Sequence, residues 1–314
     1  MASIKPFMTK EINTDDWSDE MQDGIRPYLA MSDRLLLFPN SEMSTLVWDM
    51  EDERGVGVLE GHTARIVNAS FDTTGGKAVT FACDKEFGPC AVKVWSLDTM
   101  QCTADLTSPT YVFSLLGDRL LLDSEKGPIK VWDIGGSAPV ALMDLEGHDG
   151  AVYSISASDV SNIALSGSND GTVRLWDLRT AQCVRVMEGH TDTVRSVSMD
   201  SACQTAVSGA DDMMVKVWDL GSGRCIDKYK DSLGAHKVAM HESGSSFLAA
   251  CGDVYLHAWI TASGFNQLIL DADLSSLCGS SYIYPSIAVS RDLSRVGICY
   301  LNTDEDGLGV SVWK

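Results

Sequence analysis

The chain has 314 residues, which is enough for two ordinary domains or for one large β architecture. Hydrophobic residues make up 45% and charged residues 22%, as in a globular protein that buries a full core. The 44 acidic residues outnumber the 24 lysines and arginines, and the net charge of −20 argues against nucleic acid or an anionic membrane as a direct partner. No apolar run approaches a membrane span and the N-terminus lacks a signal-peptide core, so we expect a cytoplasmic protein, with the nucleus as an alternative.

The first part of the chain, residues 1–23, is expected to hold a short strand at residues 4–9 and an acidic linker over residues 13–23. The alternative is that the whole segment is a disordered acidic tail. From residue 24 onward, short segments alternate apolar and polar residues between turn residues such as Asn169, Asp170 and Gly171. This period of two predicts β-strands, for example over residues 194–199 and 214–218.

A repeated unit is visible in the tryptophans, because seven of the eight recur at intervals of 37 to 54 residues. They are Trp48, Trp95, Trp132, Trp176, Trp218, Trp259 and Trp313. Aspartate follows four of them, and three Gly-His pairs precede a tryptophan: Gly61-His62, Gly147-His148 and Gly189-His190. These recurrences predict that one structural unit is repeated along the chain.

The period, the Gly-His pairs and the Trp-Asp pairs together resemble the WD40 repeat family. The match is closest over residues 147–228 and extends over residues 24–314, with drifted third, sixth and seventh repeats. The resemblance implies an all-β, seven-bladed β-propeller of four-stranded antiparallel blades. Since one residue follows Trp313, the seventh blade lacks a fourth strand of its own, and the N-terminal strand is expected to close the ring.

The resemblance also implies a buried chain of hydrogen bonds from indole to hydroxyl to imidazole to carboxylate, repeated in three blades. Its members are His62, Thr80, Asp84 and Trp95; His148, Ser166, Asp170 and Trp176; and His190, Ser208, Asp212 and Trp218. Leu122 and Ala249 fall where the hydroxyl would stand in the third and sixth blades. The alternative is a Ser-His-Asp catalytic triad, but a nucleophile is needed once, whereas this set recurs. With no Gly-rich phosphate loop either, we expect no enzyme activity and no cofactor.

The nine cysteines are an odd number and contain no Cys-x-x-Cys pair, so the sequence predicts neither a disulfide framework nor a metal site. Cys102, Cys183 and Cys225 each follow a short turn after a tryptophan. A cysteine repeated at one structural position is read as a small strand hydrophobe in a reducing compartment.

Partner binding is expected at the top face of the implied propeller, where the repeat register places arginines and aromatic residues. The predicted residues are Arg26, Arg65, Val67, Tyr111, Phe113, Tyr153, Thr193, Arg195 and Lys237. Basic and aromatic side chains in an acidic protein suggest an acidic or phosphorylated segment of another protein as the ligand. The alternative is a rim of solvated charges without a common partner. We therefore expect a monomeric interaction scaffold that works within a complex.

One repeat continues from its tryptophan as Trp176-Asp177-Leu178-Arg179, which resembles the WDxR box of substrate receptors of cullin-RING ubiquitin ligases. The resemblance implies that Asp177 and Arg179 lie on the bottom face, where a ligase adaptor would dock. A subunit of an RNA-processing or chromatin assembly is the other functional alternative, and a solvated turn arginine is the structural one.

Overall fold

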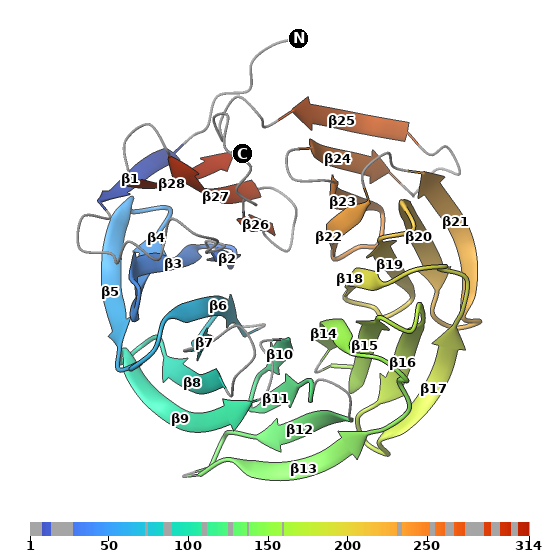
Figure 1. The fold of residues 1–314 in the computed structure, drawn as a ribbon, viewed down its shortest axis with the longest axis horizontal. Helices are drawn as coiled ribbons and strands as arrows, with labels where there is room; N and C mark the ends of the chain where they lie inside the picture. Colours follow the sequence, from blue (N-terminus) through green and yellow to red (C-terminus); the bar gives the residue numbers. More distant parts are fainter. Residues whose placement is uncertain are drawn as a thin grey trace. The chain divides into compact units, whose positions relative to one another are not determined.

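The computed structural model describes the chain over 8–13, 28–72, 75–83, 90–108, 112–124, 128–136, 138–158, 160–230, 234–251, 255–260, 267–273, 286–289, 296–302 and 307–313. Every regular element in these ranges is a β-strand (Figure 1). The chain divides into two compact units, one made of Met1–Thr107 with Leu274–Lys314 and the other of Ser108–Asp273. No helix in the described part has the length and apolar character that a membrane crossing requires.

The described strands of the first unit form three four-stranded sheets. One contains β2 (Ala30–Met31), β3 (Leu35–Ser41), β4 (Ser44–Asp49) and β5 (Arg54–Glu60), and the next β6 (Ile66–Phe71), β7 (Lys77–Ala82), β8 (Cys90–Ser96) and β9 (Gln101–Ser108). The third is ordered β1 (Met8–Asn13), β28 (Gly307–Trp313), β27 (Val296–Asn302) and β26 (Ser286–Val289). The pairs that these strands form are antiparallel, as the sequence predicts.

The second unit has four sheets among its described strands, each in simple chain order. They are β10 (Phe113–Leu116), β11 (Arg119–Leu122), β12 (Ile129–Asp133) and β13 (Val140–Leu145); β14 (Val152–Ser158), β15 (Ile163–Ser168), β16 (Val173–Asp177) and β17 (Gln182–Met187); β18 (Val194–Met199), β19 (Thr205–Ala210), β20 (Met214–Asp219) and β21 (Arg224–Lys230); and β22 (Ala235–Met240), β23 (Ser246–Cys251), β24 (Tyr255–Ile260) and β25 (Gln267–Asp273). The up-and-down order follows from the short turns that join antiparallel neighbours.

The N-terminal strand joins the last strand of the chain, as the sequence predicts, but it lies at other residues. β1 pairs with β28 from Met8 opposite Val312 to Asn13 opposite Gly307. The expected strand at residues 4–9 therefore overlaps β1 only at its end, and residues 1–7 and 14–23 lie outside the described ranges. The backbone of β1 covers one edge of β28, so that edge is not open to other chains.

A β-bulge at the tryptophan recurs where the third strand of a sheet meets the fourth. The register shifts at Trp48, Trp132, Trp176, Trp218 and Trp259. Since a bulge inserts one residue into the partner strand and bends it, the fourth strands curve in the same way in each repeat. The tryptophan spacing in the sequence thus reports a repeated backbone feature.

The core of the second unit lies between neighbouring sheets. Trp218 is 1% exposed and belongs to a cluster with Leu165, Val173 and Leu175 from the preceding sheet. Gly209 in β19 lets the backbone of β22 in the following sheet come close. A Cβ at this position would stand 2.6 Å from the carbonyl oxygen of Ala235. Apolar residues at alternate strand positions therefore form a continuous interior from sheet to sheet.

Candidate functional site

A second bulge recurs in the first strand of four sheets, and it fixes the candidate binding residues. The register skips Val67 in β6, Tyr153 in β14, Arg195 in β18 and His236 in β22. We call the three of these residues that lie in the second unit, Tyr153, Arg195 and His236, the bulge row. Bulges re-aim side chains and often lie beside functional sites. The structure thus gives a repeated position to three of the residues that the sequence singles out and adds His236.

Two residues that the sequence predicts at the position of these bulge residues, Lys237 and Phe113, lie at other positions in the strand pairing. Lys237 is one residue too late, because the distance from His236 to Trp259 equals that from Arg195 to Trp218. Phe113 pairs with Leu122 as Val197 pairs with Ser208, so Phe113 is two residues too late. The shift arises because β10 and β11 are joined by a tight turn between Leu116 and Arg119.

Of the other predicted top-face residues, two are not described by the structure, one is buried and one is partly exposed. Arg26 and Tyr111 lie outside the described residues. Thr193 is only 5% exposed, and its hydroxyl donates to the Asn169 side-chain oxygen at 2.7 Å, so it holds two turns together. Arg65 is partly exposed, and its buried Nε has no hydrogen-bond partner in the described part of the chain.

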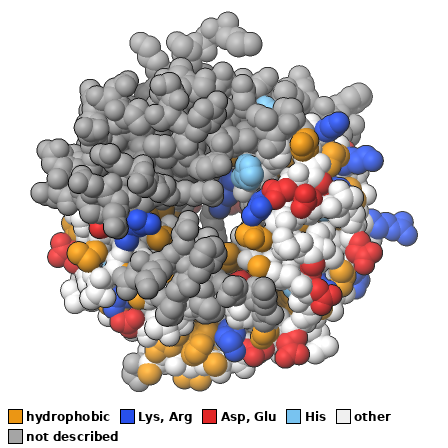
Figure 2. Space-filling model, in the orientation of Figure 1, with side chains coloured by type: hydrophobic (Ala, Val, Ile, Leu, Met, Phe, Trp, Pro, Cys, Tyr) orange, Lys and Arg blue, Asp and Glu red, His pale blue; other side chains and the backbone are white. Residues whose placement is uncertain are grey.

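Tyr153, Arg195 and Asp211 form a compact cluster in the second unit. The Arg195 guanidinium lies over the Tyr153 ring, 4.6 Å from its centroid, and its Nη2 donates to Asp211 at 2.6 Å. Hydrogen bonding to Asp211 raises the pKa of Arg195 above its usual value. On the face seen in Figure 2, histidine, basic and acidic side chains lie next to one another. The Arg195 charge is held in place but is still about one third exposed.

The hydrogen-bonded chains of the repeat are present in the sheets β14–β17 and β18–β21. In the second, the Trp218 indole donates to Ser208 at 2.8 Å, Ser208 donates to His190 Nε2 at 2.7 Å, and His190 Nδ1 donates to Asp212 at 2.8 Å. These donor directions follow because the indole is a donor only. Ser208 is 0% exposed, so it has no contact with a substrate.

The sheet β14–β17 repeats the same geometry. Trp176 donates to Ser166 at 2.8 Å, Ser166 donates to His148 at 2.7 Å, and His148 donates to Asp170 at 2.7 Å. Burial alone would raise the pKa of Asp170, but hydrogen bonds from Thr172 and His148 outweigh it and lower this pKa to about 2. Burial lowers the pKa of His148 and of His190, so both imidazoles are neutral at pH 7.

The sheet β6–β9 carries the same chain with threonine in place of serine. Trp95 donates to Thr80 at 2.7 Å, and Thr80 lies 2.7 Å from His62 Nε2. Burial, followed by the positive charge of Lys93, lowers the pKa of His62 to about 4. Asp84, the expected acid of this set, lies outside the described residues. Leu122 and Ala249 occupy the hydroxyl register in β11 and β23, as the sequence predicts.

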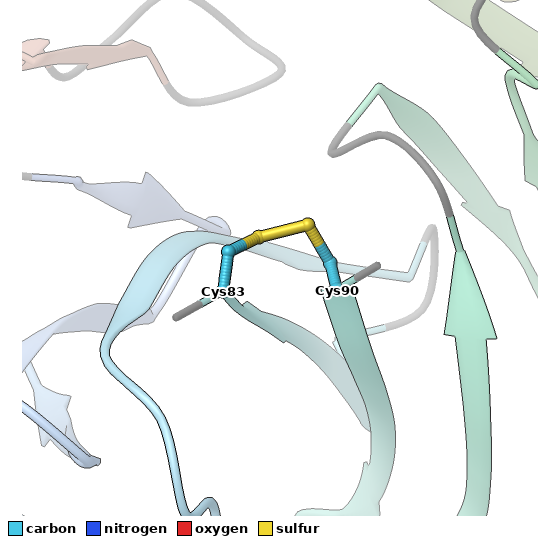
Figure 3. Close-up of a disulfide and its surroundings, with 2 residues drawn as sticks. All are labelled: Cys83 and Cys90. Carbon is cyan, nitrogen blue, oxygen red and sulfur yellow. A yellow bond between two sulfur atoms is a disulfide. The ribbon is translucent and has the colours of Figure 1, made fainter. Parts of the chain in front are cut away.

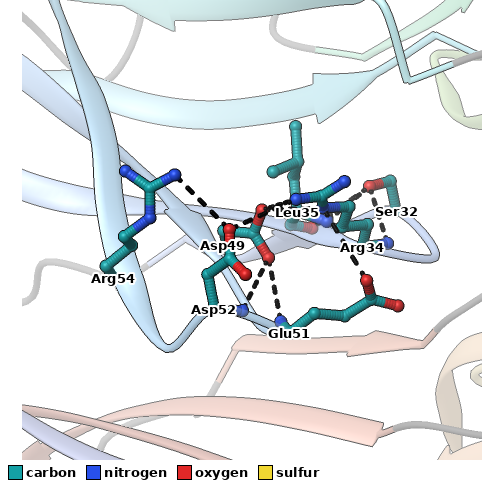
Figure 4. Close-up of polar contacts among 7 residues, drawn as sticks. All are labelled: Ser32, Arg34, Leu35, Asp49, Glu51, Asp52 and Arg54. Atoms are coloured by element: carbon teal, nitrogen blue, oxygen red, sulfur yellow. Dashed lines mark hydrogen bonds and ion pairs between the residues drawn. The ribbon is translucent and has the colours of Figure 1, made fainter.

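The aspartate of each Trp-Asp pair caps the turn that follows it. Asp49 accepts the backbone N–H groups of Glu51 and Asp52, and Asp177 accepts that of Arg179 at 2.9 Å. Figure 4 shows Arg34 reaching across to Asp49, which it contacts through Nε at 2.7 Å. This hydrogen bond lowers the pKa of Asp49. Arg34 precedes β3 and carries no motif, so the sequence offered no signal for it.

Arg179 of the WDxR box is held by its own turn. Its Nε and Nη2 donate to the two oxygens of Asp177 at 2.9 and 2.8 Å. The Arg179 side chain is 68% exposed, whereas that of Asp177 is 18% exposed. The arrangement presents a fixed guanidinium to solvent.

One cysteine prediction is wrong, because Cys83 and Cys90 form a disulfide (Figure 3). The physical reason is the hairpin: β7 and β8 pair up to Ala82 opposite Ala91, which places the next two residues face to face. Cys102, Cys183 and Cys225 are free thiols at equivalent positions, each donating to the carbonyl two residues later. Within the described residues, no group of three metal-binding side chains occurs.

Comparison with known proteins identifies the repeat. The family model for the WD domain, G-beta repeat, matches residues 140–177 and 181–219. Ribosome biogenesis protein YTM1 of Saccharomyces cerevisiae is 30% identical over 132 residues, which cover 40% of this chain and 28% of that protein. WD repeat-containing protein 3 of Homo sapiens is 31% identical over 122 residues (38% and 12%), and an Arabidopsis thaliana F-box/WD-40 repeat-containing protein is 26% identical over 90 residues (28% and 16%).

These matches span less than a third of each of those relatives. A chain in the crystal structure of the mitotic checkpoint complex superposes with a TM-score of 0.77 at 14% identity, covering 100% of this chain and 96% of that one. Likeness at this identity shows the fold, which is an all-β propeller fold built from antiparallel four-stranded sheets.

Proposed function

Because this chain belongs to the WD40 repeat family, we propose that it is a monomeric, non-enzymatic scaffold that binds a segment of another protein at the bulge row. The cluster of Tyr153, Arg195 and Asp211 carries the proposal, since it presents a fixed, partly exposed cation beside an exposed aromatic ring. Arginine and tyrosine are favoured at interaction hot spots. The buried serines of the repeated hydrogen-bonded chains support a structural rather than a catalytic role.

The chemistry of the cluster favours an acidic or phosphorylated ligand. Arg195 is already paired with Asp211, so an incoming anion has to share or displace that carboxylate. A phosphate group carries more charge than a carboxylate and binds arginine in a forked geometry, which makes it the stronger competitor. Lys237 lies next to His236 on β22, and desolvation lowers the pKa of its amine below the usual value, so the fixed positive charge of the site comes from Arg195.

A peptide array of acidic and phosphorylated segments, probed with the purified protein, tests this proposal. Arg195→Ala is expected to lose the bound spots, whereas Asp211→Asn is expected to strengthen them because it frees Arg195. Arg54→Ala, an exposed arginine on β5, is the matched control. Array binding that is the same in wild type and Arg195→Ala would contradict the proposal.

A subunit of an RNA-processing assembly is a second candidate, supported by the relatives that carry the name ribosome biogenesis protein. That role would favour the nucleus over the cytoplasm. Mass spectrometry of proteins that co-purify with a tagged chain tests it, and recovery of ribosome assembly factors is the expected result. A partner set without such factors would argue against this candidate.

A ubiquitin-ligase substrate receptor is a third candidate, and the exposed, fixed Arg179 favours it. Co-precipitation with a cullin-RING adaptor is expected to be lost in Arg179→Ala. An adaptor complex that forms equally with the variant, or does not form with the wild type, rejects this candidate.

A further inference from the structure

The sheets differ in the charge of one residue on the fourth strand, the residue that pairs with the position two before the tryptophan. Two residues before the tryptophan, the third strand of five sheets carries a basic residue opposite the fourth strand. In the sheet β14–β17 this residue is Arg174, opposite Val186, whereas in β4 the position holds Leu46. Lys93 forms an ion pair with Asp105, Lys130 lies 3.4 Å from Asp144, and His257 is opposite Asp271. In the sheet β18–β21 the same position pairs Lys216 with Lys228. The acidic partner is thus replaced by a second cation.

Like charges directly opposite each other destabilise an antiparallel pair. The Lys216 ammonium turns to the Gly189 carbonyl, to which it donates a hydrogen bond, and lies 5.9 Å from the Trp218 ring centroid. Lys228 has no ion-pair partner among the described residues. Lys216 is thus compensated inside the fold, whereas the charge of Lys228 is not, and this points to a role for Lys228 outside the fold.

The cations continue along the strand. Ile226, Lys228 and Lys230 alternate with less exposed residues and share one exposed face of β21, where Ile226 is 60% exposed. The acid between them is turned away, because Asp227 accepts the Tyr229 hydroxyl at 3.0 Å. Arg185 reaches the turn before β21, where its Nη2 donates to the Gly221 carbonyl at 3.1 Å. We call Arg185, Ile226, Lys228 and Lys230 the basic edge.

β21 is also the end strand of its sheet, so one row of its backbone N–H and C=O groups has no strand partner among the described residues. Blue side chains project from the right-hand rim of Figure 2, the side on which Figure 1 draws β21. An unpaired strand edge is a template for an added strand, and side chains at alternate positions of that strand supply specificity.

We propose that β21 binds an extended acidic segment of a partner protein, which adds to the sheet as a further strand. Acidic side chains at every second position of the segment lie along Lys228 and Lys230, and an apolar side chain covers Ile226. The charge of −20 on the whole chain makes this basic edge a local exception that an acidic partner distinguishes from the rest of the surface.

A single-stranded RNA is the other polyanion to consider, and the strand does not favour it. Binding of single strands relies on aromatic rings on which bases stack. The only ring of β21 belongs to Tyr229, which packs against Phe247 with 5.4 Å between ring centroids. The open backbone edge, in contrast, matches a polypeptide.

Fluorescence anisotropy with a labelled decapeptide of alternating glutamate and threonine tests the proposal at low ionic strength. The double variant Lys228→Asp with Lys230→Glu is expected to weaken binding by about tenfold or more, since two attractions become repulsions. Its melting temperature is expected to equal or exceed that of the wild type, because Lys216 then faces an aspartate. Arg54→Asp on β5 is the matched control and is expected to bind the peptide as the wild type does.

A peptide methylated on alternate backbone nitrogens tests the added strand, and is expected to bind about tenfold more weakly, because it cannot pair with the edge. An oligouridylate decamer is expected not to compete. The proposal is overturned if the folded double variant binds the peptide like the wild type, if the methylated peptide binds equally well, or if the RNA displaces the peptide.

Discussion

The sheets β18–β21 and β10–β13 reach the same strand order with different interiors. In the first, Ser208 joins Trp218 to His190 through hydrogen bonds. In the second, Leu122 occupies the register of Ser208, and the Trp132 indole N–H is buried without a hydrogen-bond partner among the described residues. Apolar packing is therefore enough to form the sheet. The hydrogen-bonded chain in addition gives the buried polar atoms of the tryptophan and histidine their partners and so fixes the positions of both side chains.

Removal of the central hydroxyl is expected to have the largest effect. Ser208→Ala leaves the Trp218 N–H and His190 Nε2 without partners in a buried site, which costs about 2–4 kcal/mol in the free energy of unfolding. Urea denaturation measures it. Ser208→Thr keeps the hydroxyl, as Thr80 does in the sheet β6–β9, and is expected to lose much less. Equal losses in both variants would contradict a role for the hydroxyl.

Added volume at the sheet interface is expected to have the next largest effect. Gly209→Ala places a Cβ 2.6 Å from a backbone oxygen of Ala235, whereas Gly167→Ala meets the Val194 side chain at 2.6 Å. Backbone yields less than a side chain, so we expect a loss of about 1–3 kcal/mol for Gly209→Ala and a smaller one for Gly167→Ala. Melting temperatures of the two variants test the order, and the reverse order would show that the interface after β19 is the more adaptable one.

Acid is expected to destabilise the protein in two steps. His62 has a folded-state pKa of about 4 against about 6.5 when unfolded, and burial also lowers the pKa of His148 and His190. The unfolded state therefore binds more protons, and stability falls as the pH drops from about 6.5 to 4. Asp170, with a pKa of about 2, adds a loss at lower pH, because stability present above its unfolded value disappears as it is protonated.

Unfolding free energies across this pH range measure the first step. His62→Gln is expected to reduce the slope of unfolding free energy against pH by the equivalent of up to one proton. This holds whether the substitution itself raises or lowers the stability. A slope that does not respond to His62→Gln would locate the titrating groups elsewhere.

The turn caps are expected to give the smallest effects. Asp177→Ala removes the acceptor for the Arg179 N–H and is expected to lower the melting temperature slightly, whereas Arg179→Ala is expected to leave it nearly unchanged because its ion pair is exposed. Thermal denaturation of both variants is the measurement. A larger loss in Arg179→Ala would mean that the ion pair, and not the cap, stabilises the turn.

Features that depend on a residue repeated at constant spacing could be predicted from the sequence. The tryptophans located the third strands, and the hydroxyls, histidines and aspartates of two sheets follow at fixed distances from them. The spacing fails where a turn changes length, because pairing and not chain distance decides which residues are equivalent. Phe113 was misplaced for that reason.

Contacts that use no repeated residue could not be predicted. The Cys83–Cys90 disulfide depends on where the hairpin β7–β8 stops pairing, and an odd cysteine count hides it. Arg34 reaches Asp49 across a turn, which no spacing rule encodes. The sequence shows that Lys228 is charged, but only the strand register shows that it lies opposite another lysine, Lys216.

The pairing of β1 with β28 also governs the order of events during synthesis. The strand partner of residues 8–13, at residues 307–313, is made about 300 residues later during synthesis. The first strand waits without its partner while the other sheets form, and the contact between the two has the greatest sequence separation in the molecule's described strands. Among the described strands, this sheet is therefore the last whose pairing is completed during synthesis.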